Sequence, residues 1–302
     1  MKPPVLDLTV IRALLDRHAD ELGAPVEGFT VGNTDFDFAR HRYLTGVVNL
    51  SKDSWYAESV ATTAEAAVAL GRQLARDGAH LVDIGAESTL PHAERQGIAR
   101  QIDQLLPVVR PLAEDGILVS VESYYPEVLE ATAKAGAKVF NLTGMTEADE
   151  VFALAAEYDC AVIVCYVQGG HVRDVDDFTF FEDMVPELKR YFEDLTGRAR
   201  AAGVTKCFVD PGLGFYYKNL NDSSQRVTHQ MNTFLNCFRL HALGYPTFNI
   251  LPHAPEAFRD DERRAAEPFF GVLAALGGTH MIRTHEVRTV ARVLQALGMY
   301  RR

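Results

Sequence analysis

The sequence predicts a (β/α)8 TIM barrel preceded by a short N-terminal helix and hairpin. From residue 43 onward, a short apolar run, a polar loop and a helical pattern repeat eight times. The apolar runs lack a polar face, as expected of parallel strands that are covered on every side. The length of 302 residues suits one α/β barrel, and 47% hydrophobic residues can fill a large core. We therefore expect a single domain.

The chain divides into an extension over residues 1–42 and the barrel over residues 43–302. Residues 5–22 show apolar positions at helical spacing, which predicts an amphipathic first helix. Two short strand patterns then flank Gly32 and Asn33, a pair typical of a hairpin turn. We expect the helix and the hairpin to close the bottom of the barrel.

The eight apolar runs are the expected strands: YLTGVVNL, HLVDIG, GILVSV, AKVFNL, CAVIVCY, KCFVD, PTFNIL and HMIRT. The expected helices cover residues 63–77, 96–113, 126–135, 147–158, 186–202, 232–243, 265–276 and 285–297. An open doubly wound sheet is the alternative fold. Such a sheet usually carries a GxGxxG after its first strand, and the first strand here is followed by no such motif.

Charge and composition argue against several classes of function. The 41 acidic and 30 basic residues give a net charge of −11, which disfavours a nucleic-acid partner. The four cysteines show no CxxC spacing, so we expect reduced thiols in the cytoplasm and no structural zinc. There is no signal-peptide pattern and no apolar run of about 18 residues, so a soluble protein is expected. Residues 168–183 are acidic and aromatic and are expected to form a mobile loop over the site.

Polar residues end most of the expected strands. Because parallel barrel strands end on one face, these side chains should share a pocket. The clearest case is DPGLGF, where Asp210 ends an apolar strand and Pro211, Gly212 and Gly214 turn the backbone. The strand-end residues in chain order are Asn49, Asp83, Glu122, Asn141, Cys165, Asp210, Arg283 and His285.

One group of these residues suits a planar heterocycle. Glu122, Asn141 and Asp210 supply acceptors and one amide, and a carboxylate pairs well with a ring edge that carries two N–H donors. The simpler interpretation is that such residues satisfy loop backbone groups, and that Asp210 only caps the turn that follows it.

The other group suits an anion. The candidate anion-binding residues are Asn49, Lys52, Arg283 and His285. Arg283 and His285 alternate along the last strand and its end, so both should point the same way toward the neighbouring first strand. A phosphate site is common at this place in a barrel. The alternative is that Arg283 forms a salt bridge with Glu286 or Glu87.

The motifs GVVNLSKDSW, DIGAESTLP, SVESYY, FNLTG, DPGLGF and MIRTHEV occur in this order along the chain. They resemble GxxNxTPDSF, DIGGESTRPG, SVDTYK, INDxxG, DPGIGF and RVHDV of the dihydropteroate synthase family of pterin-binding TIM barrels. The resemblance extends from about Tyr43 to Leu297. It implies a homodimeric transferase that joins p-aminobenzoate to the methylene of a dihydropterin diphosphate and releases diphosphate, with Mg²⁺ present.

The resemblance also implies roles for individual residues. The pterin would be held by Glu122, Asn141 and Asp210, with Cys165 and Phe215 beside it. The diphosphate would be held by Asn49, Arg283 and His285, with Lys52 as an added cation, and Mg²⁺ would bind through the diphosphate and Asn49. The expected catalytic residues are Asn49, Asp210, Arg283 and His285.

The sequence departs from the family pattern where the second substrate would bind. The family's Ser-Arg-Lys would fall near residues 252–254, which read Pro-His-Ala, and Leu90 replaces an arginine of the second loop. The remaining candidates for the second substrate are Tyr125, Tyr166, Tyr216, Tyr217, Lys218 and His253. We therefore expect a synthase-like transferase that uses an amine other than p-aminobenzoate. The alternatives are a non-catalytic pterin-binding paralogue or partner subunit, and a pterin-dependent methyltransferase.

Overall fold

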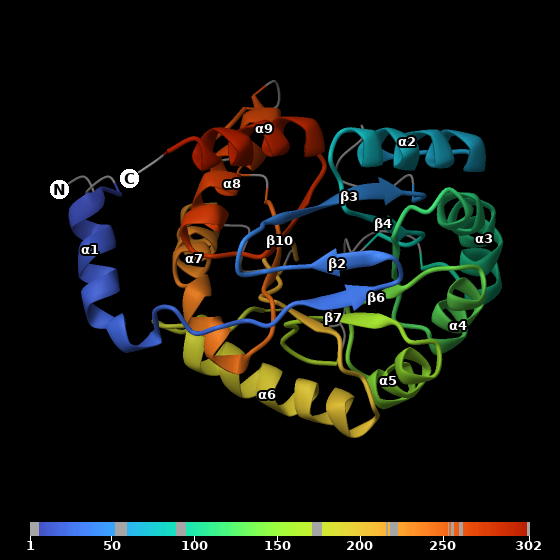
Figure 1. Ribbon diagram of the computed structural model, residues 1–302, viewed down its shortest axis with the longest axis horizontal. Helices are drawn as coiled ribbons and strands as arrows, with labels where there is room; N and C mark the ends of the chain where they lie inside the picture. Colours follow the sequence, from blue (N-terminus) through green and yellow to red (C-terminus); the bar gives the residue numbers. More distant parts are fainter. Residues whose placement is uncertain are drawn as a thin grey trace.

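The computed structural model describes residues 6–51, 59–88, 95–170, 177–215, 217, 223–252, 254, 257–259 and 262–300. Eight parallel strands form one sheet in the order β8-β7-β6-β5-β4-β3-β10-β9. A parallel bridge between Val209 and Thr247 joins the two ends of this order, so the sheet closes on itself. Figure 1 shows the helices as a ring around the strands. The expected α/β barrel is confirmed.

The strands are β3 (Tyr43–Asn49), β4 (Leu81–Gly85), β5 (Val119–Glu122), β6 (Val139–Leu142), β7 (Ala161–Cys165), β8 (Cys207–Asp210), β9 (Phe248–Ile250) and β10 (Met281–Thr284). The surrounding helices are α2 (Ala64–Arg76), α3 (Ile98–Glu114), α4 (Pro126–Lys134), α5 (Ala148–Glu157), α6 (Val185–Ala201), α7 (Ser223–Leu235), α8 (Ala266–Leu276) and α9 (Val287–Gly298). Within the described residues, no helix combines the length and the apolar character needed to cross a membrane.

The helix after β8 differs from the expected range of 232–243. The α-helix α7 begins earlier, at Ser223, and ends at Leu235. A 3-10 helix over Cys237–Leu243 follows and ends at Gly244, whose φ of 79° lies in the left-handed region. The polar start of α7 looks like a loop in the sequence, because only its later turns carry a clear apolar face.

The hairpin closes the N-terminal end of the barrel. Strands β1 (Phe29–Val31) and β2 (Thr34–Phe36) are antiparallel, and Val31 pairs with Thr34 across the expected two-residue turn. Val31, Phe36 and Phe38 are buried in a cluster with the residues that begin the barrel strands, among them Tyr43 and Phe248. In Figure 1 the hairpin lies across the centre of the strands. The opposite, C-terminal end of the strands is the face where the candidate site lies.

Helix α1 (Leu8–Arg17) lies elsewhere than expected. It runs beside α7 at the edge of the molecule, not beneath the strands (Figure 1), and none of its residues is buried. The residues that follow it hold it in place, because Glu21 forms ion pairs with Arg239, at 2.8 Å, and with Lys189. Val10 and Leu14 of α1 instead line a groove that also borders α7.

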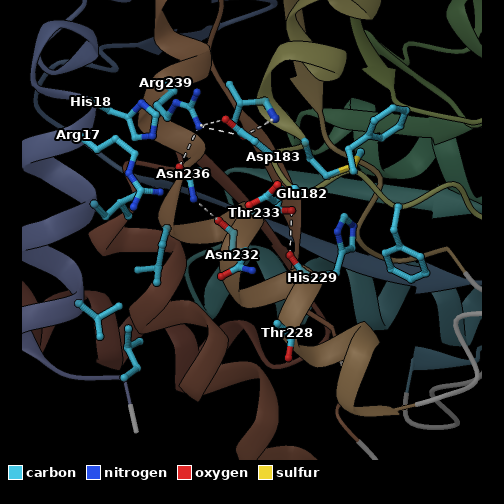
Figure 2. Close-up of a pocket in the computed structure, with 18 of the residues that line it drawn as sticks. Arg17, His18, Glu182, Asp183, Thr228, His229, Asn232, Thr233, Asn236 and Arg239 are labelled. Atoms are coloured by element: carbon cyan, nitrogen blue, oxygen red, sulfur yellow. Dashed lines mark hydrogen bonds and ion pairs between the residues drawn. The ribbon is translucent and has the colours of Figure 1, made fainter. Parts of the chain in front are cut away.

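A groove of about 820 Å³ separates α1 from α7 and from residues 180–185 (Figure 2). Along one side, Arg239 bridges the carboxylate of Asp183, at 2.8 Å, and the side-chain oxygen of Asn236, at 3.2 Å. No strand-end residue of the barrel lines this groove. It is therefore separate from the candidate site.

Candidate active site

The strand-end side chains of six barrel strands meet in one cluster at the C-terminal face. The cluster consists of Asp83 from β4, Glu122 from β5, Asn141 from β6, Cys165 from β7, Asp210 from β8 and Arg283 from β10. A continuous chain of short contacts joins all six. The barrel topology makes this possible, because adjacent parallel strands end at the same level.

Arg283 lies between two carboxylates of this cluster. Its Nε donates to Asp83 Oδ2 at 2.8 Å, and its Nη2 donates to Glu122 Oε2 at 2.9 Å. The side chain is 11% exposed. The sequence grouped Arg283 with the anion-binding residues, whereas these contacts place it against the carboxylates. The expected alternative partners are engaged elsewhere: Glu286 with Arg264, and Glu87 with a tyrosine hydroxyl.

Asp83 belongs to the centre of the site, although the sequence analysis gave it no role. It is fully buried, and its Oδ2 accepts from Asn141 Nδ2 at 3.0 Å as well as from Arg283. Its other oxygen, Oδ1, is buried and has no hydrogen-bond partner among the described residues. Asp83 therefore orients the two side chains that flank it. A carboxylate inside the otherwise apolar run HLVDIG was the available signal, because burial of an acid requires a partner.

Asp210 combines two roles. Its Oδ1 accepts from the backbone N–H of Gly212 at 2.8 Å, which caps the turn as the simpler interpretation proposed. Its Oδ2 lies 3.7 Å from the thiol of Cys165, which also lies 3.4 Å from Asn141 Oδ1. Gly212 has a φ of 77°, and a Cβ there would meet the carbonyl oxygen of Tyr166 at 2.4 Å. The glycine thus permits the tight turn that presents Asp210 to the site.

The buried carboxylates hold protons unusually tightly. Burial raises the pKa of Asp210 to about 7, against the lowering effects of the Gly212 N–H and of Arg283. Burial likewise raises the pKa of Glu122 to about 7; Arg283 lowers it, and the carboxylates of Asp83 and Asp210 raise it further. The cluster thus contains three carboxylates, those of Asp83, Glu122 and Asp210, and one guanidinium, that of Arg283. Such a site favours a ligand that brings several N–H donors.

The thiol of Cys165 stays protonated at neutral pH. Burial raises its pKa well above the usual value, and the charges of Asp210 and Glu122 raise it further. The thiol lies between Asn141 and Asp210, and its role beside a heterocycle stays a prediction. Phe215 lies next to the turn, close to Gly212, and is partly buried.

The other anion-binding candidates are held by partners of their own. Strands β3 and β10 are neighbours, so Asn49 and His285 follow adjacent strands. Asn49 Nδ2 donates to Ser59 Oγ at 2.7 Å. His285 Nδ1 lies 2.7 Å from Glu267 Oε1. Lys52 is outside the described residues. The clustering of Asn49, Arg283 and His285 around one anion stays a prediction.

The structure separates the second-substrate candidates. Tyr166 and Tyr217 are packed in the core, 2% and 3% exposed. Tyr125 is partly exposed and lies against the ring of Tyr124, with ring centroids 4.6 Å apart. The remaining candidates, Tyr216, Lys218 and His253, lie outside the described residues, as does Leu90.

The loop expected over the site is described at both of its ends. Near its start, the side-chain amide of Gln168 forms two hydrogen bonds with the backbone of Thr179, at 2.6 and 2.9 Å. Near its end, Asp183 pairs with Arg239 at 2.8 Å. The bonds between Gln168 and Thr179 thus join two parts of this loop to each other, and the pair of Asp183 with Arg239 ties its end to the rest of the protein.

Residues suited to a direct metal site are not grouped in the described part of the chain. No set of three or more His, Cys, Asp or Glu side chains there is arranged to hold an ion.

The comparisons with known proteins agree with this geometry. The model of the family described as pterin binding enzyme matches residues 45–285. The dihydropteroate synthase of Synechocystis sp. is 26% identical over 292 residues, covering 92% of this chain and 96% of that protein. That of Streptococcus pyogenes serotype M6 is 28% identical over 267 residues, covering 84% and 94%.

Solved structures of similar proteins contain ligands. The dihydropteroate synthase of Xanthomonas albilineans with 4-aminobenzoic acid is similar with a TM-score of 0.75 and 26% identity, covering 92% of this chain and all of that one. The enzyme of Thermus thermophilus in complex with 6HMPPP is similar with a TM-score of 0.71 and 25% identity, covering 90% and 100%.

Proposed function

The chain belongs to the family of pterin-binding enzymes, and on this premise we propose that it is a dihydropteroate synthase-like transferase. It joins the methylene carbon of a pterin-like diphosphate to an amine and releases diphosphate. The observation that carries this proposal is the buried cluster at the strand ends, in which three carboxylates and an amide face one guanidinium.

The cluster is suited to one edge of a pterin-like ring. Asp210 and Glu122 are carboxylates whose burial makes their negative charge costly, so N–H donors of a ring would stabilise them strongly. Asn141 can donate and accept, and its orientation is set by Asp83. A ring with two N–H donors and a carbonyl therefore matches Asp210, Glu122 and Asn141 in turn.

The diphosphate would leave toward Asn49, Arg283 and His285, with Lys52 as a further cation. As the bond between the methylene carbon and the diphosphate oxygen breaks, positive charge develops on the carbon and negative charge on the leaving group. Donors fixed around the leaving group stabilise this transition state. Mg²⁺ bound with the diphosphate and Asn49 would supply further neutralisation of the leaving oxygens. The amine then bonds to the exposed carbon and loses a proton.

We propose that the amine is not p-aminobenzoate. A benzoate carboxylate requires a cation, and the Ser-Arg-Lys motif and the second-loop arginine are replaced here by Pro252, His253, Ala254 and Leu90. Each lost charge-assisted contact weakens binding by roughly 1.5–3 kcal/mol. Loss of two would lower turnover on the order of a hundred-fold or more. Tyr125, whose ring is tilted by 44° against that of Tyr124, is a surface better suited to a neutral or flatter partner.

Turnover assays test the proposal. The protein is mixed with a dihydropterin diphosphate, Mg²⁺ and either p-aminobenzoate or a panel of neutral aromatic and aliphatic amines, and diphosphate release is followed. We expect release with at least one other amine and little or none with p-aminobenzoate. Turnover of p-aminobenzoate at the rate of a known synthase would show that the replacement of the Ser-Arg-Lys motif and of the second-loop arginine does not prevent use of this substrate. Pterin binding without turnover of any amine would favour the non-catalytic paralogue.

Two further properties belong to the proposal. The family resemblance implies a homodimer, which sedimentation analysis can check. The four cysteines are free and buried, in keeping with a reduced, cytoplasmic protein.

A further inference from the structure

Glu267 is a fully buried carboxylate at the start of α8, outside the residues assigned above. Its hydrogen bonds go to three consecutive residues at the end of β10. Oε2 accepts from the hydroxyl of Thr284, from the backbone N–H of His285 at 2.9 Å and from the backbone N–H of Glu286 at 3.2 Å. Oε1 lies 2.7 Å from the ring Nδ1 of His285.

This arrangement is more than a structural cap. A buried carboxylate is tolerated only when its oxygens are satisfied, and the backbone and hydroxyl donors at Oε2 already supply three bonds. The fourth contact, at Oε1, goes to a side chain placed among the anion-binding candidates. We propose that Glu267 is a positioning residue that fixes the ring of His285 and determines which of its nitrogens carries a proton.

The reason lies in the chemistry of the pair. An ionised carboxylate only accepts hydrogen bonds, so the Nδ1 of His285 must carry the proton. Nε2 lies on the side of the ring that faces away from Glu267. A carboxylate behind the ring also favours the imidazolium form, in which Nε2–H donates to an anion with charge assistance. Glu267 thus acts on the leaving diphosphate through His285. The effect of Glu267 on the diphosphate rests on the proposed function, whereas its effect on the protonation of the His285 ring does not.

The substitution Glu267→Gln makes a distinctive prediction. Three donors face the position of Oε2, so the carbonyl oxygen of the glutamine should occupy it, and the amide NH₂ should take the position of Oε1. That NH₂ is a donor, so Nδ1 of His285 must become an acceptor and the ring must hold its proton on Nε2. A change that only loosened the turn would not reverse the tautomer.

The experiment uses the whole protein labelled with ¹⁵N-histidine. The His285 ring signals are assigned by their loss in His285→Asn, and the tautomer is read from the two ring-nitrogen shifts. We expect protonated Nδ1 in the wild type and an Nε2–H tautomer in Glu267→Gln. Inorganic diphosphate with Mg²⁺, titrated by calorimetry, should bind about tenfold more weakly to the variant, because a charge-assisted bond becomes a neutral one.

Glu286→Gln is the matched control. It removes the same charge from the same turn, but the Glu286 carboxylate pairs with Arg264, at 2.6 Å. The His285 tautomer and diphosphate affinity should match the wild type. An Nε2–H tautomer in the wild type, or an unchanged ring spectrum in Glu267→Gln, would overturn the proposal. If Glu267→Gln did not fold, the wild-type tautomer alone would decide. Protonated Nδ1 without any diphosphate binding would support the role of Glu267 and remove the anion site from the proposed function.

Discussion

Replacing Asp210 by asparagine should weaken ring binding and at the same time stabilise the empty protein. In the variant, the amide oxygen can keep the bond to the Gly212 N–H, which lies 2.8 Å from Oδ1 in the wild type. The amide NH₂ would then stand where Oδ2 faces Cys165 and the proposed ring edge. A donor would meet a donor, and a charge-assisted bond worth roughly 1.5–3 kcal/mol would be lost. We expect ring affinity to fall at least about tenfold.

The gain in stability follows from the raised pKa. The folded-state pKa of Asp210 is about 7, above the ordinary value of 3.8, so the folded protein holds this proton more tightly than the unfolded chain. Stability therefore falls as pH rises through this window, by on the order of 2–4 kcal/mol in total. Asparagine does not titrate and escapes this loss. The advantage of the variant should grow from pH 5 to pH 8 and reach a few kcal/mol, or several degrees in Tm.

The assay compares Tm at pH 5 and pH 8 and measures binding of a soluble pterin by calorimetry at pH 8. Asp115→Asn is the control, because it removes a carboxylate of equal charge from a surface pair with Arg72, at 2.6 Å. Its effect on stability should stay within about 1 kcal/mol. Equal ring affinity in the wild type and Asp210→Asn would refute the heterocycle assignment. A variant less stable than the wild type at pH 8 would refute the account of the buried charge.

Three other expectations follow from the same cluster. Arg283→Met leaves Asp83 and Glu122 without their guanidinium, so it should lower the free energy of unfolding by about 3 kcal/mol at pH 8. The loss should be smaller at pH 5, where Glu122 takes up a proton. An equal loss at both pH values, measured by urea denaturation, would contradict this. Cys165 should resist iodoacetamide in the native protein at pH 8, as read by mass spectrometry, and alkylation at the rate of a free thiol would contradict the raised pKa. Inorganic diphosphate should compete with a pterin diphosphate in calorimetry but not with a phosphate-free pterin, and competition with both would place the anion in the ring site.

The fold could be predicted from the sequence because its signals are local. The run KCFVD is apolar until its final acid, and the observed strand β8 covers Cys207–Asp210. The turn residues Gly32 and Asn33 fix the register of the hairpin, and they lie next to the residues that they pair, Val31 and Thr34. By contrast, the position of α1 depends on Glu21, just after that helix, meeting Arg239 in the 3-10 helix after α7, 218 residues further along the chain. No periodic pattern reports such a contact.

The candidate site could be predicted only in part for the same reason. The alternation of Arg283 and His285 across the end of β10 predicts that both side chains belong to the strand-end face, but not which groups they contact. Arg283 meets Asp83, 200 residues earlier, and His285 meets Glu267 on the preceding helix. These pairings arise from closure of the barrel and from how α8 packs on β10. Asp83 and Glu267 are fully buried acids, and a search for acids within apolar patterns would have selected both.

The excess of acid at the strand ends favours the proposal that this cluster binds a ligand over the view that it serves stability. Asp83, Glu122 and Asp210 share one guanidinium, and a fold selected for stability alone would not bury two carboxylates whose pKa values reach about 7. In the proposed complex, N–H donors of the ring would relieve the charge imbalance, so part of the cost of burying the carboxylates would be recovered as binding free energy. Arg283 links the two halves of the site, because it contacts Glu122 on the ring side and lies two residues before His285 on the proposed anion side. Only two of its five N–H donors are used by the carboxylate contacts, so the proposed contact of Arg283 with the leaving group does not require it to release Asp83 or Glu122.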